Sequence, residues 1–436
     1  MSRLLQASTP RHPEALVLLL LAVSGNPAIT EQPWSKAAIV LIATTLFLTI
    51  GRKIQIAPAT TYLVFIAPFL LVFFAQLFTL GFVSKPFVLG FLLKIYIGAI
   101  IITKLGKTFP IALLNALVIV TLISFPFYII HFLNLQSFLI PFALTPYNGL
   151  EETFSIGLYT VRPLLPPETI LRNSGMLWEP GAFQGFLNIA FLLNFHNIPR
   201  LLRHGKLRLC VLLLGFATTF STTGYLVFFI LVVSYILFYS RLPVVAIGIA
   251  SCFALAAGFG LFLSADFLQR KIASQLDDAL MLPEGEFSNQ RMGSFKFDTF
   301  YMRRAPVFGN GFHEKTRYRF HPELLNLIEE NVNLGHGNGF SNLIASAGFV
   351  GAGWYFLALI FFHRRSLCHA LIMALVMVIL LQGEQFLNFP FFLALPFVQP
   401  SPSRSRWRWS PPSRPTRLAS NSRPVAPPHS PNAISV

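Results

Sequence analysis

The chain carries little charge for its length. Only 11% of its 436 residues are Asp, Glu, Lys or Arg, whereas 54% are apolar and 46 are phenylalanine. Soluble domains have about a quarter of their residues charged. The composition therefore excludes a water-soluble globular protein and indicates an integral membrane protein.

Cysteine is almost absent. The three cysteines, Cys210, Cys252 and Cys368, all fall within apolar runs, so the polar loops are held together without disulfides. The sequence also lacks a Cys-x-x-Cys motif and a glycine-rich nucleotide-binding loop, and His313 and Glu314 have no partners at metal-ligand spacing. We therefore expect no metal and no other cofactor.

Acidic residues are scarce as well: 17 Asp and Glu stand against 33 Lys and Arg, which gives a formal net charge of +16. In a soluble chain this excess would suggest a nucleic-acid partner. Here thirteen Lys and Arg occupy the short connections on one side of the predicted spans, and only Lys36 and Lys85 occupy those on the other. This is the positive-inside pattern, which predicts a cytoplasmic N-terminus, a membrane-lipid environment and no nucleic acid.

Apolar runs recur at the length that a membrane span requires, about 20 residues for a bilayer core of about 30 Å. We predict an all-α fold, a polytopic transmembrane helical bundle of about 10–12 spans. The predicted spans are 14–30, 37–50, 61–83, 86–103, 110–132, 180–196, 207–222, 224–240, 243–265, 339–362, 367–382 and a short last one at 386–398.

These spans divide the chain into six parts. They are 1–132 with the first spans, the loop 133–179, the spans of 180–265, the large loop 266–338, the spans of 339–398 and a tail at 399–436. Both long loops face outward, because four spans separate them. The larger loop mixes aromatic, aliphatic and charged residues, and its segment 322–329 is typical of a short amphipathic helix that begins at a proline.

The two ends of the chain have special compositions. Arg3 and Arg11 precede the first apolar run, as in a secretory signal, but Asn26-Pro27 and the span that follows favour an uncleaved signal-anchor over a cleaved signal. The tail 399–436 is rich in Pro, Ser and Arg, and this composition predicts disorder. It is either a solvated tail or a segment attracted to anionic lipid, and whether it is the native C-terminus stays open.

The most specific stretch runs from Arg172 to Phe183, Arg-Asn-Ser-Gly-Met-Leu-Trp-Glu-Pro-Gly-Ala-Phe. Proline after Glu179 disfavours helix at Glu179 and suits the first helical position, so a helix is predicted to begin at Pro180 with Glu179 at its cap. Glu179 either only caps this helix or contacts sugar hydroxyls and accepts a proton from one.

Arg-x-Ser-Gly followed by Glu-Pro and an apolar helix resembles the loop-to-helix signature of the bacterial O-antigen polymerase and O-antigen ligase superfamily. Three further segments follow in that family's order. They are Ser-Thr-Thr-Gly at 221–224, Arg291 with Pro-Val-Phe-Gly-Asn-Gly at 306–311, and His336 with Gly-Asn-Gly at 337–339. Thr222 stands where the family often has arginine, and Gly337 where it commonly has Asn or Ser. The resemblance covers about residues 170–355.

The resemblance implies an all-helical glycosyltransferase in the bacterial inner membrane. Its donor would be a glycan carried by a polyprenyl diphosphate, its site would face outward, and it would need no metal or nucleotide. A flippase and a chain-length regulator of the same polysaccharide pathway are the expected protein partners.

The residues suit this chemistry. A diphosphate leaving group gathers negative charge as the glycosidic bond breaks, and arginine pairs well with phosphate oxygens. We expect Arg172 and Arg291 to bind the diphosphate, with Arg303 and Arg304 as further candidates. His336 and Glu179 are the candidate catalytic residues, since His336 binds phosphate when protonated or accepts the acceptor's proton when neutral. Each of these residues has an ordinary structural or solvated alternative.

Three functions remain open from the sequence. The first is polymerisation of lipid-linked repeat units into a surface polysaccharide, O-antigen or exopolysaccharide. The second is a ligase that transfers the glycan to lipid A core or to a protein, and the third is a membrane transporter or flippase. Lys94 and Glu384 lie within or between apolar runs, where a charge often has a function, and their roles stay open.

Overall fold

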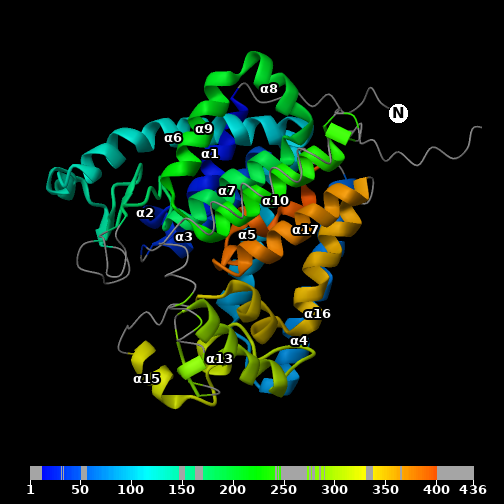
Figure 1. The fold of residues 1–436 in the computed structure, drawn as a ribbon. Coiled ribbons are helices and arrows are strands. Elements are labelled where there is room, and N and C mark those ends of the chain that lie inside the picture. Colours follow the sequence, from blue (N-terminus) through cyan, green and yellow to red (C-terminus); the bar gives the residue numbers. More distant parts are fainter. Residues whose placement is uncertain are drawn as a thin grey trace, which may run out of the picture.

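The computed structural model describes residues 12–30, 32, 34–50, 56–146, 153–162, 170–240, 243, 245–246, 273, 276, 280–283, 286–288, 290–329, 337–363 and 366–399. Within them the protein is mostly helical, as predicted (Figure 1). The helices of the first half are α1 (Pro13–Val23), α2 (Pro27–Thr30), α3 (Ser35–Thr49), α4 (Ile56–Leu80), α5 (Lys85–Leu105) and α6 (Phe109–Phe132). The longer helices that follow are α7 (Pro180–Leu193), α8 (Ile198–His204), α9 (Lys206–Thr218), α10 (Thr222–Phe238), α13 (Arg291–Arg304), α15 (Pro322–Glu329), α16 (Gly339–Phe362) and α17 (Leu367–Leu381).

Three helical stretches of the described chain are long and apolar enough to cross a membrane: Thr60–Leu80, Lys85–Phe132 and Gly339–Phe362. The second stretch comprises α5 and α6, which are separated at Gly106, where the backbone adopts φ 51°. Shorter apolar helices accompany them, namely α1, α3, α7, α10 and α17. The predicted span 243–265 lies outside the described residues except for three positions at its start.

Residues 386–398, predicted as the last span, do not form one continuous helix. They form η6 (Phe386–Asn388), α18 (Pro390–Leu393) and η7 (Leu395–Phe397). Pro390 and Pro396 interrupt a helix because each lacks an amide hydrogen. Most of the segment's side chains are buried in the main apolar core, and its backbone passes so close to Gly98 of α5 that a side chain there would collide with the Pro390 carbonyl oxygen. The segment is therefore part of the packed interior.

The first long loop folds onto the end of α6. It contains η3 (Gln136–Phe142) and a small antiparallel sheet of β1 (Thr145–Pro146), β2 (Phe154–Ser155) and β3 (Thr160–Val161). Phe154, Tyr159 and Val161 pack with Leu139 in a small core against α6. This packing places the end of β3, and Arg162 directly after it.

The second long loop packs beside the ends of α4 and α16, away from α8 and α9 (Figure 1). It contains α13, α14 (Glu314–Arg317) and α15, and the short helix predicted over 322–329 is confirmed as α15. Phe297 and Tyr301 of α13, Leu324 of α15 and Ala345 of α16 form the core that joins the loop to the bundle.

The Pro-Val-Phe-Gly-Asn-Gly segment at 306–311 runs alongside a break in α16. Gly348 interrupts the helix with φ 67°. The amide of Asn310 donates to the Ala345 carbonyl at 2.8 Å, and that of Phe349 donates to the Pro306 carbonyl at 2.8 Å. A side chain at Gly348 would collide with the carbonyl oxygen of Val307. The glycines of this segment thus allow two backbones to meet.

We expect Gly348→Ala to destabilise the protein by about 2–3 kcal/mol, because alanine is strained at positive φ and its Cβ would separate the two backbones. Gly353→Ala on the same helix is the matched control, since no described atom lies within 4 Å of a Cβ there. The measurement is thermal unfolding of both purified variants in detergent. Equal unfolding temperatures for the two variants would contradict the docking of 306–311.

Candidate functional site

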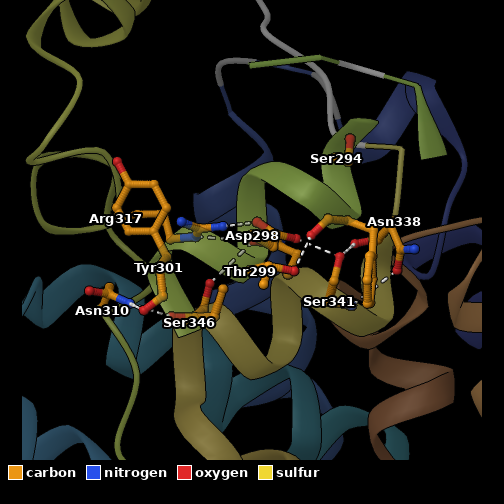
Figure 2. A network of polar contacts seen from close by, with 12 residues as sticks. Ser294, Asp298, Thr299, Tyr301, Asn310, Arg317, Asn338, Ser341 and Ser346 are labelled. Carbon is orange, nitrogen blue, oxygen red and sulfur yellow. Dashed lines mark hydrogen bonds and ion pairs between the residues drawn. The ribbon is translucent and has the colours of Figure 1, made fainter. Parts of the chain in front are cut away.

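A buried polar network holds α13 against the start of α16 (Figure 2). Asp298 is fully buried and pairs with Arg317, whose side chain is 3% exposed. The Ser341 hydroxyl donates to the other Asp298 oxygen at 2.5 Å, and the Ser341 amide donates to Asn338 Oδ1 at 3.0 Å. At the next turn, Ser294 Oγ accepts from the Gly337 amide at 3.0 Å. These contacts fix the position of α13, and so of Arg291 at its first turn.

The Arg-Asn-Ser-Gly turn is held by Asn173. Its side-chain amide donates to Ser124 Oγ of α6 and to Thr218 Oγ1 of α9, both at 3.1 Å. Its Oδ1 accepts from the Gly175 amide at 2.9 Å, and Gly175 adopts φ 58°. The buried asparagine therefore ties the turn to two helices and places Arg172 on one side of it and Glu179 on the other.

Glu179 occupies the N-cap of α7, as predicted, with extended backbone at φ −154°. Within the described residues its side chain makes no capping hydrogen bond. Instead, Glu179 Oε1 accepts from Arg162 Nη1 at 2.8 Å, and the two side chains are 32% and 25% exposed. The carboxylate thus faces a cation at a partly open surface and does not act as a simple helix cap.

Glu384 lies beside this pair, in the turn after α17, and is only 8% exposed. Its Oε2 accepts from the indole Nε1 of Trp178 at 3.4 Å. The Glu179 carboxyl is near enough to influence its protonation. A Cβ at Gly181 would lie 2.5 Å from Glu384 Oε1, so the glycine leaves the space into which this carboxyl fits.

Burial and neighbouring charges act oppositely on the two carboxyls. Burial alone raises both pKa values, but at Glu179 the charges of Arg162 and Arg172 outweigh it and lower the pKa below its ordinary range. At Glu384, burial and the negative charge of Glu179 together hold the pKa well above its ordinary value, although Arg291 acts against them. The surroundings of the pair therefore favour the ionised form of Glu179 and the protonated form of Glu384.

Arg291 closes the site from the side of the second long loop. Its Nη1 donates to Thr223 Oγ1 at 2.6 Å, and its guanidinium passes Gly383, where a Cβ would lie 3.3 Å from Nη2. Thr223 belongs to the Ser-Thr-Thr-Gly turn, whose Ser221 caps α10 by accepting from the Gly224 amide. The turn at 221–224 and the start of α13 thus meet at this arginine.

Several helices begin around the carboxyl pair. Glu179 stands at the N-cap position of α7, Thr223 lies in the first turn of α10, and Arg291 begins α13. Asn338 caps α16 and also donates to Gln382 Oε1 at 2.7 Å, two residues before Glu384. The positive ends of these helices add to the arginine charges, so the site favours an anion.

Of the predicted site residues, the structure brings together Glu179, Arg172 and Arg291. Arg303 and Arg304 do not join them, since they lie at the far end of α13, about 20 Å away at 1.5 Å per helical residue. Arg304 is exposed and stacks on Phe300 with its Cζ 3.3 Å from the ring centroid. The structure therefore does not bring these two arginines to the carboxyl pair.

His336 and Lys94 are two further residues that the sequence singled out. His336 lies outside the described residues. Lys94 lies half-buried within α5. Among the described residues, no group of three or more His, Cys, Asp and Glu is arranged to hold a metal ion.

Sequence reasoning missed Arg162 and gave Glu384 no role. Arg162 is one of only two basic Lys or Arg residues in the loop 133–179, and Glu384 is the only acidic residue after position 338. An isolated charge among apolar runs is the signal that singles out each of them.

The chain matches no protein-family model, and a search of curated proteins finds no similar sequence.

Proposed function

We propose that the protein polymerises polyprenyl-diphosphate-linked oligosaccharide units into a surface polysaccharide, an O-antigen or exopolysaccharide. The observation that carries this proposal is the cluster of Arg162, Arg172 and Arg291 around the Glu179–Glu384 carboxyl pair. Three guanidinium groups near one partly buried carboxyl pair make this site attractive to an anion such as a diphosphate, whose oxygens pair well with arginine.

The reaction that fits these groups is glycosyl transfer. A hydroxyl of the acceptor sugar attacks the anomeric carbon of the donor, the new C–O bond forms, and the bond to the diphosphate breaks with its electron pair on the leaving oxygen. Arginine donors stabilise the charge that develops there. Glu179 is the carboxylate open to solvent, and it lies where it can bind the acceptor hydroxyl and receive its proton.

The number of membrane spans that we propose is larger than the three helical stretches of span length. We propose a multi-pass protein of the bacterial inner membrane with about 10–12 spans, a cytoplasmic N-terminus and both long loops outward. The apolar helices α1, α3, α7, α10 and α17 support additional crossings. A flippase would deliver the lipid-linked unit to the outer face, and a chain-length regulator would act on the product.

The test is gel analysis of the surface glycan from cells that lack the gene, with and without the wild-type gene restored. Glycan reduced to single repeat units, and restored to long chains by the gene, is the expected result. Long chains that stay on the lipid carrier and do not reach their final acceptor would indicate a ligase instead. Unchanged glycan would reject both functions in favour of transport.

A further inference from the structure

A small cavity lies where α7, α10 and α16 end and α17 begins. Its polar lining residues are His196, Tyr239, His363, Ser366, His369 and Gln399, and the rest of its lining is apolar. His363 follows the end of α16 and His369 lies in the first turn of α17, whereas the candidate site lies at the opposite ends of these two helices. The topology proposed above places the cavity on the cytoplasmic side.

His369 ties three helices together at this cavity. Its side chain is only 9% exposed. Its Nδ1 lies 3.0 Å from the hydroxyl of Tyr239, the residue that follows α10. Its ring also meets the ring of Phe195, two residues after α7, edge-on with the centroids 6.5 Å apart. The start of α17 is therefore joined to the ends of α7 and α10 through this imidazole.

His363 is fully buried at the end of α16. Its Nδ1 lies 2.9 Å from the Leu359 carbonyl of its own helix, and because a carbonyl only accepts, this nitrogen carries a hydrogen. Burial lowers the pKa of His363, although the carbonyls of Leu359 and Val398 act against it. The surroundings of the ring therefore favour its neutral form.

The groups around the two histidines offer no negative charge to a proton. His196 is exposed, and Tyr239 and Cys368 are the other titratable groups beside the pair. No Asp or Glu is among the described residues that line the cavity. A proton on either ring would thus be a buried charge without a counter-charge, which is unfavourable. The charged residues of the flanking elements α6 and α8 are exposed and basic, namely Lys107 before α6 and Arg200 and Arg203 in α8.

We propose that His363 and His369 form a proton-sensitive anchor. In their neutral forms they hold the end of α16 and the start of α17 in the bundle, and protonation releases them. Both helices lead to the candidate site, where Asn338 at the N-cap of α16 donates to Gln382 after α17 at 2.7 Å. Acidification at one end of the protein therefore loosens the two helices that frame the site at the other end. The anchor does not depend on which reaction the site performs.

Acidification should lower the stability of the protein through this anchor. Histidine in the unfolded chain binds a proton below its ordinary pKa of about 6.5, whereas the pKa of buried His363 is lowered in the folded protein. The unfolded state then takes up protons that the folded state does not. The contribution of the anchor is therefore complete above about pH 6.5 and decreases as the pH falls below this value.

The experiment compares thermal unfolding of the full-length protein in detergent at about pH 8 and about pH 5.5, on either side of the ordinary pKa of histidine. For the wild type we expect an unfolding temperature about 5 °C or more lower at the acidic pH. His369→Asn should reduce this difference to less than half, because the amide occupies the place of Nδ1 and takes up no proton. His363→Asn should act in the same way, since its amide can still donate to the Leu359 carbonyl.

His204→Asn is the matched control. His204 lies at the same end of the protein, in α8, but its side chain is exposed. This variant should keep the full pH difference of the wild type. The comparison removes the contribution of the carboxyl groups, which titrate equally in all of these proteins.

Hydrogen exchange provides a second measurement that reports on the anchor directly. After correction for the intrinsic exchange rate at each pH, deuterium uptake in peptides that cover α17 should be faster in the wild type at the acidic pH, and less so in His369→Asn. The anchor would be overturned if uptake over α17 were the same at both pH values. It would also be overturned if His363→Asn and His369→Asn both kept the pH difference of the wild type.

Discussion

Replacing Arg291 by alanine should reduce formation of long glycan chains by about 100-fold or more. The guanidinium is held at the carboxyl pair by Thr223 and supplies positive charge to a partly buried site. Removing one preorganised donor to a developing anion typically costs two to three orders of magnitude in rate, about 10²–10³. The measurement is the length distribution of surface glycan in cells that carry only the variant gene, normalised to the amount of protein in the membrane.

Arg304→Ala is the matched control for this prediction. It removes the same side chain from the same helix, but at the exposed far end, where the guanidinium stacks on Phe300. Chain length should stay at the wild-type value. If Arg291→Ala and Arg304→Ala reduce the long chains equally, the effect belongs to the charge of the loop as a whole and the assignment of Arg291 fails.

Asp298→Ala should cause the largest loss of stability, about 3–5 kcal/mol. Asp298 is fully buried and is the ion-pair partner of Arg317, whose guanidinium is 3% exposed. Removing one member of a buried pair leaves the other charge without compensation. The variant also frees the Ser341 hydroxyl and loosens α13 from α16. The expected observation is a much lower unfolding temperature in detergent and less protein in the membrane.

Two further variants make this prediction specific. Thr299→Ala changes the next residue of α13, whose hydroxyl donates within the helix to the Phe295 carbonyl at 2.9 Å, and should be close to neutral. Asp298→Ala combined with Arg317→Met should recover part of the lost stability, because the uncompensated charge is gone. A double variant no more stable than Asp298→Ala alone would argue that packing, and not charge, dominates at this position.

The sequence predicted the helices well wherever an apolar run was bounded by strong signals. Pro180 begins α7, and Pro322 begins α15, because proline suits the first helical turn and disfavours helix at the residue before it. The segment 386–398 shows the limit of the same reasoning. Its composition is that of a span, but its two internal prolines break the helix, and only the packing against α5 shows where the pieces lie.

The candidate site was predicted in part. Glu179, Arg172 and Arg291 stood out from their local motifs, whereas Arg303 and Arg304 were chosen only for their charge and lie at the other end of α13 from Arg291. Arg162 and Glu384 carry no motif of their own. Their place in the site depends on which loops lie close together in space. The local sequence around each residue contains no information on the distance between those loops.

By itself, the sequence determined that this is an apolar, mostly helical protein with two long polar loops. The composition and the spacing of apolar residues in a segment reflect whether that segment lies in lipid or in water. The tertiary structure alone decided the chemistry of the site. Trp178 and Glu384 are 206 positions apart and become hydrogen-bonded neighbours because α7 and α17 both pack against α10, and because Phe386, after α17, packs against Gly185 of α7. That packing buries one carboxyl beside another and surrounds them with three arginines, and the resulting shift in protonation is a property of the assembled site.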